Sequence, residues 1–304
     1  MMTRLLWLSL LFNGLGLAQE VPLRTKSVPE MPPLTLRSQA KINLKIIPEC
    51  SALWASHLHP GVFWTLSDSG NAPHIVPIKV DGTFPVTAAG VPWTHVNVKG
   101  ATNHDWEALT GDETRMMVCD VGNNISRRKE LQIYVFPEPP LGAAEVTPTK
   151  QYTFSWPDQK IFPDPELAHD CEAAFIWRKK LYLLTKHRRD TLTDFWRVDL
   201  PETGDQAVLT KLYRFDAHGM VTDASVSPDG KRLAMLTYRM VWVFTLPAEG
   251  EDIFSGPTLV APLAPPATSW QIEGCAWLND QRLLMGSEQG DLYQVSLTDL
   301  QEAK

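Results

Sequence analysis

A short motif recurs five times along this chain of 304 residues. Each copy begins with an acidic residue, continues with small residues and then becomes apolar. Self-similarity at a period of roughly 50 residues is typical of folds in which each repeat is one supersecondary unit. The recurrence therefore favours a repeat architecture over a single irregular domain. The five acids are Glu49, Glu107, Glu172, Asp223 and Glu273, separated by 58, 65, 51 and 50 residues.

Short apolar runs that are typical of β-strands follow each acid. In the unit of Asp223 they are Arg232–Thr237 and Met240–Thr245, after a Pro-Asp-Gly turn. Four short strands in each unit of about 50 residues form the blade of a β-propeller. The sequence therefore predicts an all-β fold, a single five-bladed β-propeller. The expected fourth strands of the first four units are Phe84–Val91, Gln151–Trp156, Val208–Phe215 and Pro257–Leu263.

The fifth unit lacks a fourth strand, because the sequence ends at Lys304 soon after its third. The N-terminal stretch Leu36–Ile47 has strand character and can supply the missing strand, which would close the ring and remove an exposed edge. A six-bladed ring is the alternative, because the 65-residue spacing before Glu172 has room for a degenerate blade. The proline-rich stretch Pro157–Pro165 favours a loop there instead.

The first 18 residues have the pattern of a secretory signal peptide. Arg4 precedes an apolar run, and Gly16 and Ala18 supply small residues before a cut at Gln19. The run is shorter than the ~20 residues that span a bilayer. We therefore expect a linker over 19–34, a propeller domain over 35–304 and a secreted or periplasmic monomer without a membrane span. A net charge of −7 argues against a nucleic-acid partner.

Three runs of the sequence resemble a widespread group of exported bacterial β-propeller proteins, most of them uncharacterised. These runs are Asn103–Leu109, Asp120–Asn124 and Ile133–Pro139. The unit of Glu172 is similar to one blade of the five-bladed calcium-activated nucleotidases. The pattern of a glutamate, small residues and a tryptophan is similar to gluconolactonase-type propellers. These two likenesses imply a divalent cation at the ring centre, held by side chains from several blades, and they imply no particular catalytic residue.

The repeated acids are candidate metal ligands. The first strand of every propeller blade lines the central channel, so the five acids should converge near one mouth. Crowded carboxylates repel one another, and either protons or a cation must relieve that repulsion. A hard cation with oxygen ligands and a flexible coordination number suits Ca²⁺. The alternative is that the acids accept hydrogen bonds from backbone amides and water.

Polar loops between the second and third strands should open at the same mouth. Several share an acid, a glycine and a polar residue, and the glycines suit hairpin turns with positive φ. Two loops are basic, which indicates either a solvated surface or a site for a phosphate or carboxylate ligand. The candidate ligand-binding residues are Asp68, Asp120, Asn123, Arg127, Arg128, Lys186 and Arg188, with Glu288 as a further acid near the channel.

His104 and His169 each lie three residues before an acid of the repeat. A histidine at this place could act as a general base, or it could satisfy loop hydrogen bonds. They are the candidate catalytic residues, and the sequence contains no complete catalytic motif to support them.

The four cysteines test the closure of the ring. Alternation of side chains along strands predicts disulfides Cys50–Cys275 and Cys119–Cys171, with free buried thiols as the alternative.

Two function classes are consistent with these patterns. The first is an exported binding or scaffold propeller with a Ca²⁺-binding acidic ring in its channel. Its partner would be a small anionic ligand, or an extracytoplasmic protein or glycan. The alternative is a metal-dependent hydrolase of phosphate esters or lactones that acts at the same channel mouth.

Overall fold

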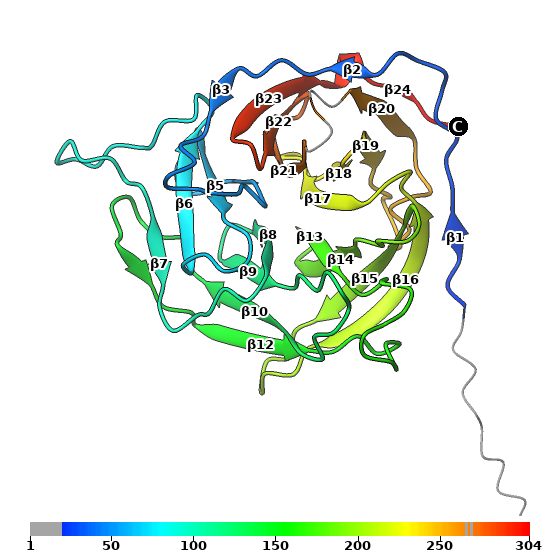
Figure 1. Cartoon of the computed structure of the whole chain (residues 1–304), viewed down its shortest axis with the longest axis horizontal. Helices are drawn as coiled ribbons and strands as arrows, with labels where there is room; N and C mark the ends of the chain where they lie inside the picture. The colour runs from blue at the N-terminus through cyan, green and yellow to red at the C-terminus, as the bar shows by residue number, and fades with distance from the viewer. Residues whose placement is uncertain (1–19, 265–266, 268–269) are drawn as a thin grey trace, which may run out of the picture.

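The computed structural model describes residues 20–264, 267 and 270–304. Its strands form five sheets around a central channel, which confirms the predicted five-bladed β-propeller rather than the six-bladed alternative (Figure 1). The predicted signal peptide, 1–18, lies outside the described residues. Within the described part, no helix is long and apolar enough to cross a bilayer.

Each blade contains four antiparallel strands. The first strand lies next to the channel, and each following strand lies farther out. The first blade contains β4 (Trp54–Ala55), β5 (Val62–Leu66), β6 (His74–Lys79) and β7 (Val96–Val98). The second contains β8 (Trp106–Gly111), β9 (Met116–Asp120), β10 (Leu131–Phe136) and β12 (Lys150–Phe154). The third contains β13 (Cys171–Trp177), β14 (Lys180–Thr185), β15 (Leu192–Asp199) and β16 (Val208–Asp216).

The last two blades follow the same plan. The fourth contains β17 (Val221–Val226), β18 (Arg232–Thr237), β19 (Met240–Thr245) and β20 (Thr258–Ala264). The fifth contains β21 (Ile272–Asn279), β22 (Arg282–Ser287), β23 (Asp291–Ser296) and, from the N-terminal region, β3 (Ala40–Lys41). A short 3₁₀ helix, η1 (Leu297–Asp299), follows β23.

The ring closes through the N-terminal region, as predicted. β3 pairs with β23 in antiparallel register, with Lys41 opposite Asp291 and Ala40 opposite Leu292 (Figure 1). The strand itself covers only residues 40–41 of the expected stretch Leu36–Ile47. The closing blade therefore takes strands from both ends of the chain, which ties them together.

The fourth strand of the first blade lies later in the chain than predicted. The expected strand Phe84–Val91 is a loop in which Val86 and Val91 are at least half exposed. The strand is β7 instead, because Val96 and Val98 alternate with a polar residue and bury their side chains completely. Burial of alternate residues, rather than apolar content alone, decides which segment joins the sheet.

The described part of the expected linker 19–34, residues 20–34, lies against the outer edges of two blades. β1 (Leu23–Arg24) pairs in parallel with β16, and β2 (Leu34–Thr35) pairs in parallel with β20. β24 (Gln301–Glu302) pairs with the same β20, and the backbones of Ser27 and Lys304 are hydrogen-bonded to each other. The first blade gains a similar outer strand from β11 (Glu145–Val146). These strands cover sheet edges that would otherwise be exposed.

The two predicted disulfides are absent, and all four cysteines, each in the described part, are free buried thiols. Cys50 packs in the cluster between the first and fifth blades, whereas Cys275 packs between the fourth and fifth. Their thiols therefore lie on opposite faces of the fifth blade. Cys119 and Cys171 do share the cluster between the second and third blades, and they remain thiols there.

Candidate functional site

Three of the five repeated acids converge at the channel. Glu107, Glu172 and Glu273 are each the second residue of the first strand of their blade, where the pairing register shifts. Such a β-bulge leaves one residue unpaired and redirects its side chain. All three glutamates are at most 3% exposed, and one oxygen of each lies within 4.8 Å of the others. We call these three residues the inner group.

The other two acids do not join the inner group. In the fourth blade the register shift falls at Thr222, which is fully buried and donates to the carbonyl of Ile272 at 2.8 Å. Asp223, one residue later, accepts backbone amides of Leu53, Ala224 and Cys275. This is the alternative expected from sequence, in which an acid is satisfied by backbone amides.

Glu49 differs from the three glutamates for a similar reason. It precedes the first residue of β4, Trp54, by five positions, whereas Glu107 lies within β8. Its carboxylate is partly exposed and accepts a 3.4 Å hydrogen bond from Asn71. The linear motif therefore aligned residues that occupy different positions in their blades.

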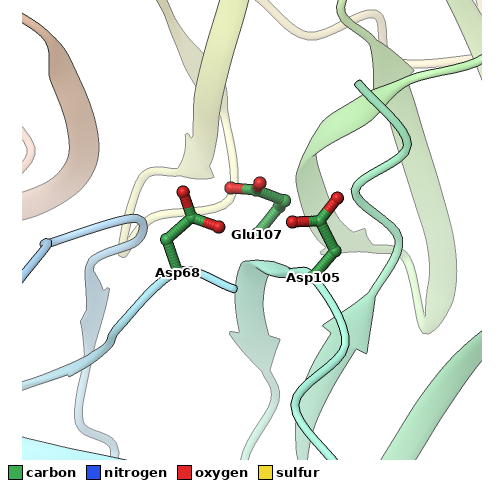
Figure 2. A group of neighbouring side chains, drawn as sticks. All are labelled: Asp68, Asp105 and Glu107. Carbon is green, nitrogen blue, oxygen red and sulfur yellow. The ribbon is translucent and has the colours of Figure 1, made fainter. Parts of the chain in front are cut away.

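A second cluster of carboxylates shares Glu107. Asp68 follows β5, Asp105 immediately precedes β8, and their oxygens lie within 4.8 Å of each other and of Glu107. Figure 2 shows the three carboxylates gathered from two adjacent blades. We call Asp68, Asp105 and Glu107 the outer group, because Asp68 is only half-buried. Asp68 is among the residues predicted from the sequence, whereas Asp105 was not predicted, although it lies two residues before the repeated acid.

The outer group carries strong electrostatic strain. Burial raises the pKa of Glu107 well above its ordinary value, and the charges of Glu172 and Asp68 raise it further. Burial, together with the charge of Asp68, raises the pKa of Asp105 to about 7. No hydrogen bond from a described residue reaches the Glu107 carboxylate. Such carboxylates either hold protons or are relieved by a cation.

The inner group already contains a cation. The Lys186 ammonium lies 2.5 Å from Oε1 of Glu172 and 3.6 Å from Oε1 of Glu273. Burial lowers the pKa of Lys186, but the charges of Glu172 and Glu273 outweigh burial and raise it well above the ordinary value. Oε2 of Glu172 is buried and has no hydrogen-bond partner. One oxygen of this group is therefore left without the stabilisation that buried charges require.

Tyr238 connects the inner group to the fifth blade. Its hydroxyl donates to Oε1 of Glu273 at 2.7 Å, and it accepts from Lys186 and from Gln271. Gln271 also donates to Glu288 at 2.9 Å. Burial and the charge of Glu273 raise the pKa of Glu288 to about 8. Glu288 thus lies near the channel as expected, whereas Tyr238 was not foreseen because it belongs to no repeated pattern.

Gly122 sets the spacing of the outer group. It does not have positive φ, unlike Gly70 and Gly290, so the hairpin explanation does not apply to it. A Cβ atom there would lie 2.4 Å from Cγ of Asp105 and 2.8 Å from Cγ of Glu107. A close approach of carboxylates to the backbone therefore requires glycine at this position.

The remaining loop residues chosen from sequence mostly form the wall of the mouth. Asp120 is fully buried, pairs with Arg128 at 2.7 Å and accepts the backbone amide of Asp105. Asn123 accepts the backbone amides of Arg127 and Arg128 at 2.8 Å each. These contacts hold the loop after β9 in the position that places Asp105.

The cations of this wall differ in exposure. Arg188 bonds to Asp170 at 2.6 Å and contacts Glu172 at 3.3 Å, so its charge is largely neutralised. Arg127 is exposed, and its guanidinium has no partner within the described residues. The basic loops therefore combine buried ion pairs with two exposed cations, Arg127 and Arg189, that have no partner within the described residues.

The two candidate histidines lie outside both carboxylate groups. His169 is held between Asp164 at 2.7 Å and Asp158 at 3.0 Å, one at each ring nitrogen. His104 is exposed, and only its backbone amide contacts the site, through Asp120. Neither ring contacts a glutamate of the inner group in the described structure.

Comparisons with known proteins add little beyond this geometry. No protein-family model matches the sequence, and no curated protein has detectable similarity to it. Among solved structures, a chain in a crystal structure of the mitotic checkpoint complex is similar over 97% of this chain and 99% of that chain. The identity is 10% and the TM-score is 0.40, so this likeness carries no functional argument. The resemblance to exported propeller proteins rests on the sequence motifs alone.

Proposed function

We propose that this protein is an exported β-propeller that binds one divalent cation, Ca²⁺, at the outer group and acts as a binding or scaffold protein. The observation that carries the proposal is the Glu107 carboxylate, which is 3% exposed and receives no hydrogen bond from a described residue. It lies beside the carboxylates of Asp68 and Asp105. A divalent cation is the simplest charge that satisfies all three carboxylates at once.

The choice of Ca²⁺ follows from the chemistry of the ligands. The outer group offers only carboxylate oxygens, which suit hard cations rather than soft transition metals. Asp68 is half-buried in a loop, so additional water ligands can reach the ion. Ca²⁺ accepts six to eight oxygen ligands in flexible geometry, whereas Mg²⁺ demands a regular octahedron.

Export is supported by the N-terminal sequence pattern, and it fits a Ca²⁺ site. Residues 1–18 have the composition of a signal peptide, and we propose a secreted or periplasmic location for the mature chain. Extracellular modules function with weak Ca²⁺ sites, whose Kd is roughly 10⁻⁴–10⁻³ M. The partner, a small anion or an extracytoplasmic protein or glycan, would bind at the mouth beside the exposed Arg127.

A metal-dependent hydrolase is the second candidate, and one observation favours it. The pKa of Asp105 is raised to about 7 by burial and by Asp68, which is the range that suits a general acid or base near neutral pH. In this function the cation would polarise a phosphate ester or lactone, and Asp105 or a neighbouring carboxylate would move the proton. The two histidines would then have no catalytic role.

Thermal unfolding with EDTA and then with excess Ca²⁺ tests the proposed function. A cation that binds only the folded state at 100 times its Kd stabilises that state by about 2.7 kcal/mol. For a domain of this size we expect the Tm to rise by about 4–5 °C. Glu107→Gln should abolish the rise, whereas Glu145→Gln, at an exposed salt bridge on β11, should preserve it.

Absence of a Ca²⁺-dependent rise in the unmodified protein would refute the proposed function. The hydrolase candidate requires a further result, which is turnover of a phosphate ester or lactone that depends on Ca²⁺ and is lost in Asp105→Asn. Ca²⁺ binding without such turnover would support the binding function and contradict the hydrolase candidate.

A further inference from the structure

Lys186 occupies the inner group in the manner of a bound cation. Its side chain is 2% exposed, and its ammonium contacts Oε1 of Glu172 at 2.5 Å. The hydroxyl of Tyr238 lies 2.7 Å from the same ammonium and donates to Glu273. The Lys186 ammonium therefore stabilises two glutamates. It contacts Glu172 directly, and it reaches Glu273 mainly through the hydroxyl of Tyr238. A buried charge of this kind persists only when its partners neutralise it.

Lys186 is a cation at a position of the blade where the other four blades have none. It is the first residue after the second strand of its blade. The residues that follow the second strands of the other blades are Ser67, Val121, Tyr238 and Glu288. Only the third blade supplies a cation at this position. Apart from Arg188, which contacts Oε1 of Glu172 at 3.3 Å, the positive charge of the inner group comes from Lys186 rather than from the repeat.

The inner group keeps the spacing of a metal site despite this ammonium. Oxygens of Glu107, Glu172 and Glu273 lie within 4.8 Å of one another. Oε2 of Glu172 is buried without a hydrogen-bond partner, although Oε1 of the same carboxylate contacts both Lys186 and Arg188. The group therefore has an unused ligand atom in addition to suitable spacing.

We propose that Lys186 is the resident cation of the inner group and restricts the channel mouth to a single divalent cation, bound at the outer group. This inference rests on the proposed function. Glu107 belongs to both groups, so a metal ion at the outer group and one at the inner group would share this carboxylate, whereas the Lys186 ammonium contacts Glu172 and Glu273. Removal of the ammonium leaves three carboxylates that a second metal ion can bind.

A Ca²⁺ titration of the full mature chain, followed by calorimetry, tests this role. The unmodified protein should bind one Ca²⁺, and Lys186→Met should bind two. Lys180→Met is the matched control, because Lys180 pairs with Glu251 at an exposed site on the third blade and should leave the stoichiometry at one. Equal stoichiometry in the unmodified protein and Lys186→Met would overturn the inference.

The result also separates this inference from the proposed function. If the unmodified protein binds no Ca²⁺ while Lys186→Met binds one, the proposed function fails and the role of Lys186 stands. If neither binds Ca²⁺, both fail.

A second measurement follows the ammonium in the unmodified protein and uses a variant only to assign its signal. In protein labelled with ¹⁵N-lysine, the buried ammonium of Lys186 should exchange its protons slowly and give a side-chain NMR signal, which Lys186→Arg assigns by its loss. The signal should persist when Ca²⁺ saturates the protein. Loss of the signal on addition of Ca²⁺ would show that the metal displaces the ammonium, which contradicts the inference.

Discussion

Substitution of Gly122 tests whether the outer group holds the cation. In Gly122→Ala the added methyl group would lie 2.4 Å from Cγ and 2.5 Å from Oδ2 of Asp105, and 2.8 Å from Cγ of Glu107. These separations are well below van der Waals contact, so the carboxylates must move. The loop cannot yield easily, because the amide of Gly122 bonds to the carbonyl of Asp105 at 3.0 Å.

The expected magnitudes follow from this crowding. Insertion of a methyl group into a packed site costs about 1–3 kcal/mol of folding stability. Displacement of residues that position metal ligands lowers affinity by about 10- to 100-fold. In Gly122→Ala we therefore expect a moderate loss of stability in EDTA and a larger relative loss of Ca²⁺ binding.

The assay is calorimetric titration with Ca²⁺, combined with thermal unfolding in EDTA. Gly111→Ala is the matched control, because Gly111 ends the same strand, β8, at the opposite end from Glu107. A Cβ atom there would lie 2.6 Å from the ring of Trp54 and would also crowd its surroundings. This control should lose stability and keep its Ca²⁺ affinity.

Unchanged Ca²⁺ affinity in Gly122→Ala would refute the assignment of the cation to Asp68, Asp105 and Glu107. Equal loss of affinity in both variants would show that general destabilisation, rather than the geometry of the outer group, is responsible.

Three further predictions concern stability and covalent state. The pKa values of Asp105, Glu107 and Glu288 are raised in the folded protein, so the folded protein holds protons that the unfolded chain releases. In EDTA, the free energy of unfolding should therefore fall as pH rises from about 4 to about 8. Urea unfolding at pH 5 and pH 8 checks this sign, and higher stability at pH 8 would contradict it. Asp223→Asn should lower the free energy of unfolding in urea by about 2–4 kcal/mol, because an amide cannot accept all three backbone hydrogen bonds. The number of bound Ca²⁺ ions should not change. Alkylation of the unfolded, unreduced protein should modify all four cysteines, as measured by mass spectrometry. Two cysteines that stay unmodified because they form a disulfide would disprove the free-thiol state.

The bulges explain why the candidate site could be predicted only in part. A linear motif aligns acids by sequence, but side-chain direction depends on how each strand pairs with its neighbour. Glu107, Glu172 and Glu273 lie at the register shift of their blades. Asp223 lies one residue beyond the shift and therefore points its carboxylate toward backbone amides.

The prediction of the disulfide Cys50–Cys275 was wrong for a related reason. Parity along a strand places adjacent residues on opposite faces only while the pairing is regular. β21 contains a register shift between Ile272 and Gly274, just before Cys275. The face of Cys275 therefore differs from the face that simple counting assigns.

The sequence by itself determined the fold class, the number of blades and the closure of the ring, because these follow from a pattern that repeats five times and from the strand missing at one end. The tertiary structure alone decided which acids share the channel. It also placed Asp105 beside Asp68 and the Lys186 ammonium between two glutamates. Periodic burial is a local property that a sequence records directly, whereas the meeting of charges from different blades depends on bulges and loop contacts across the ring.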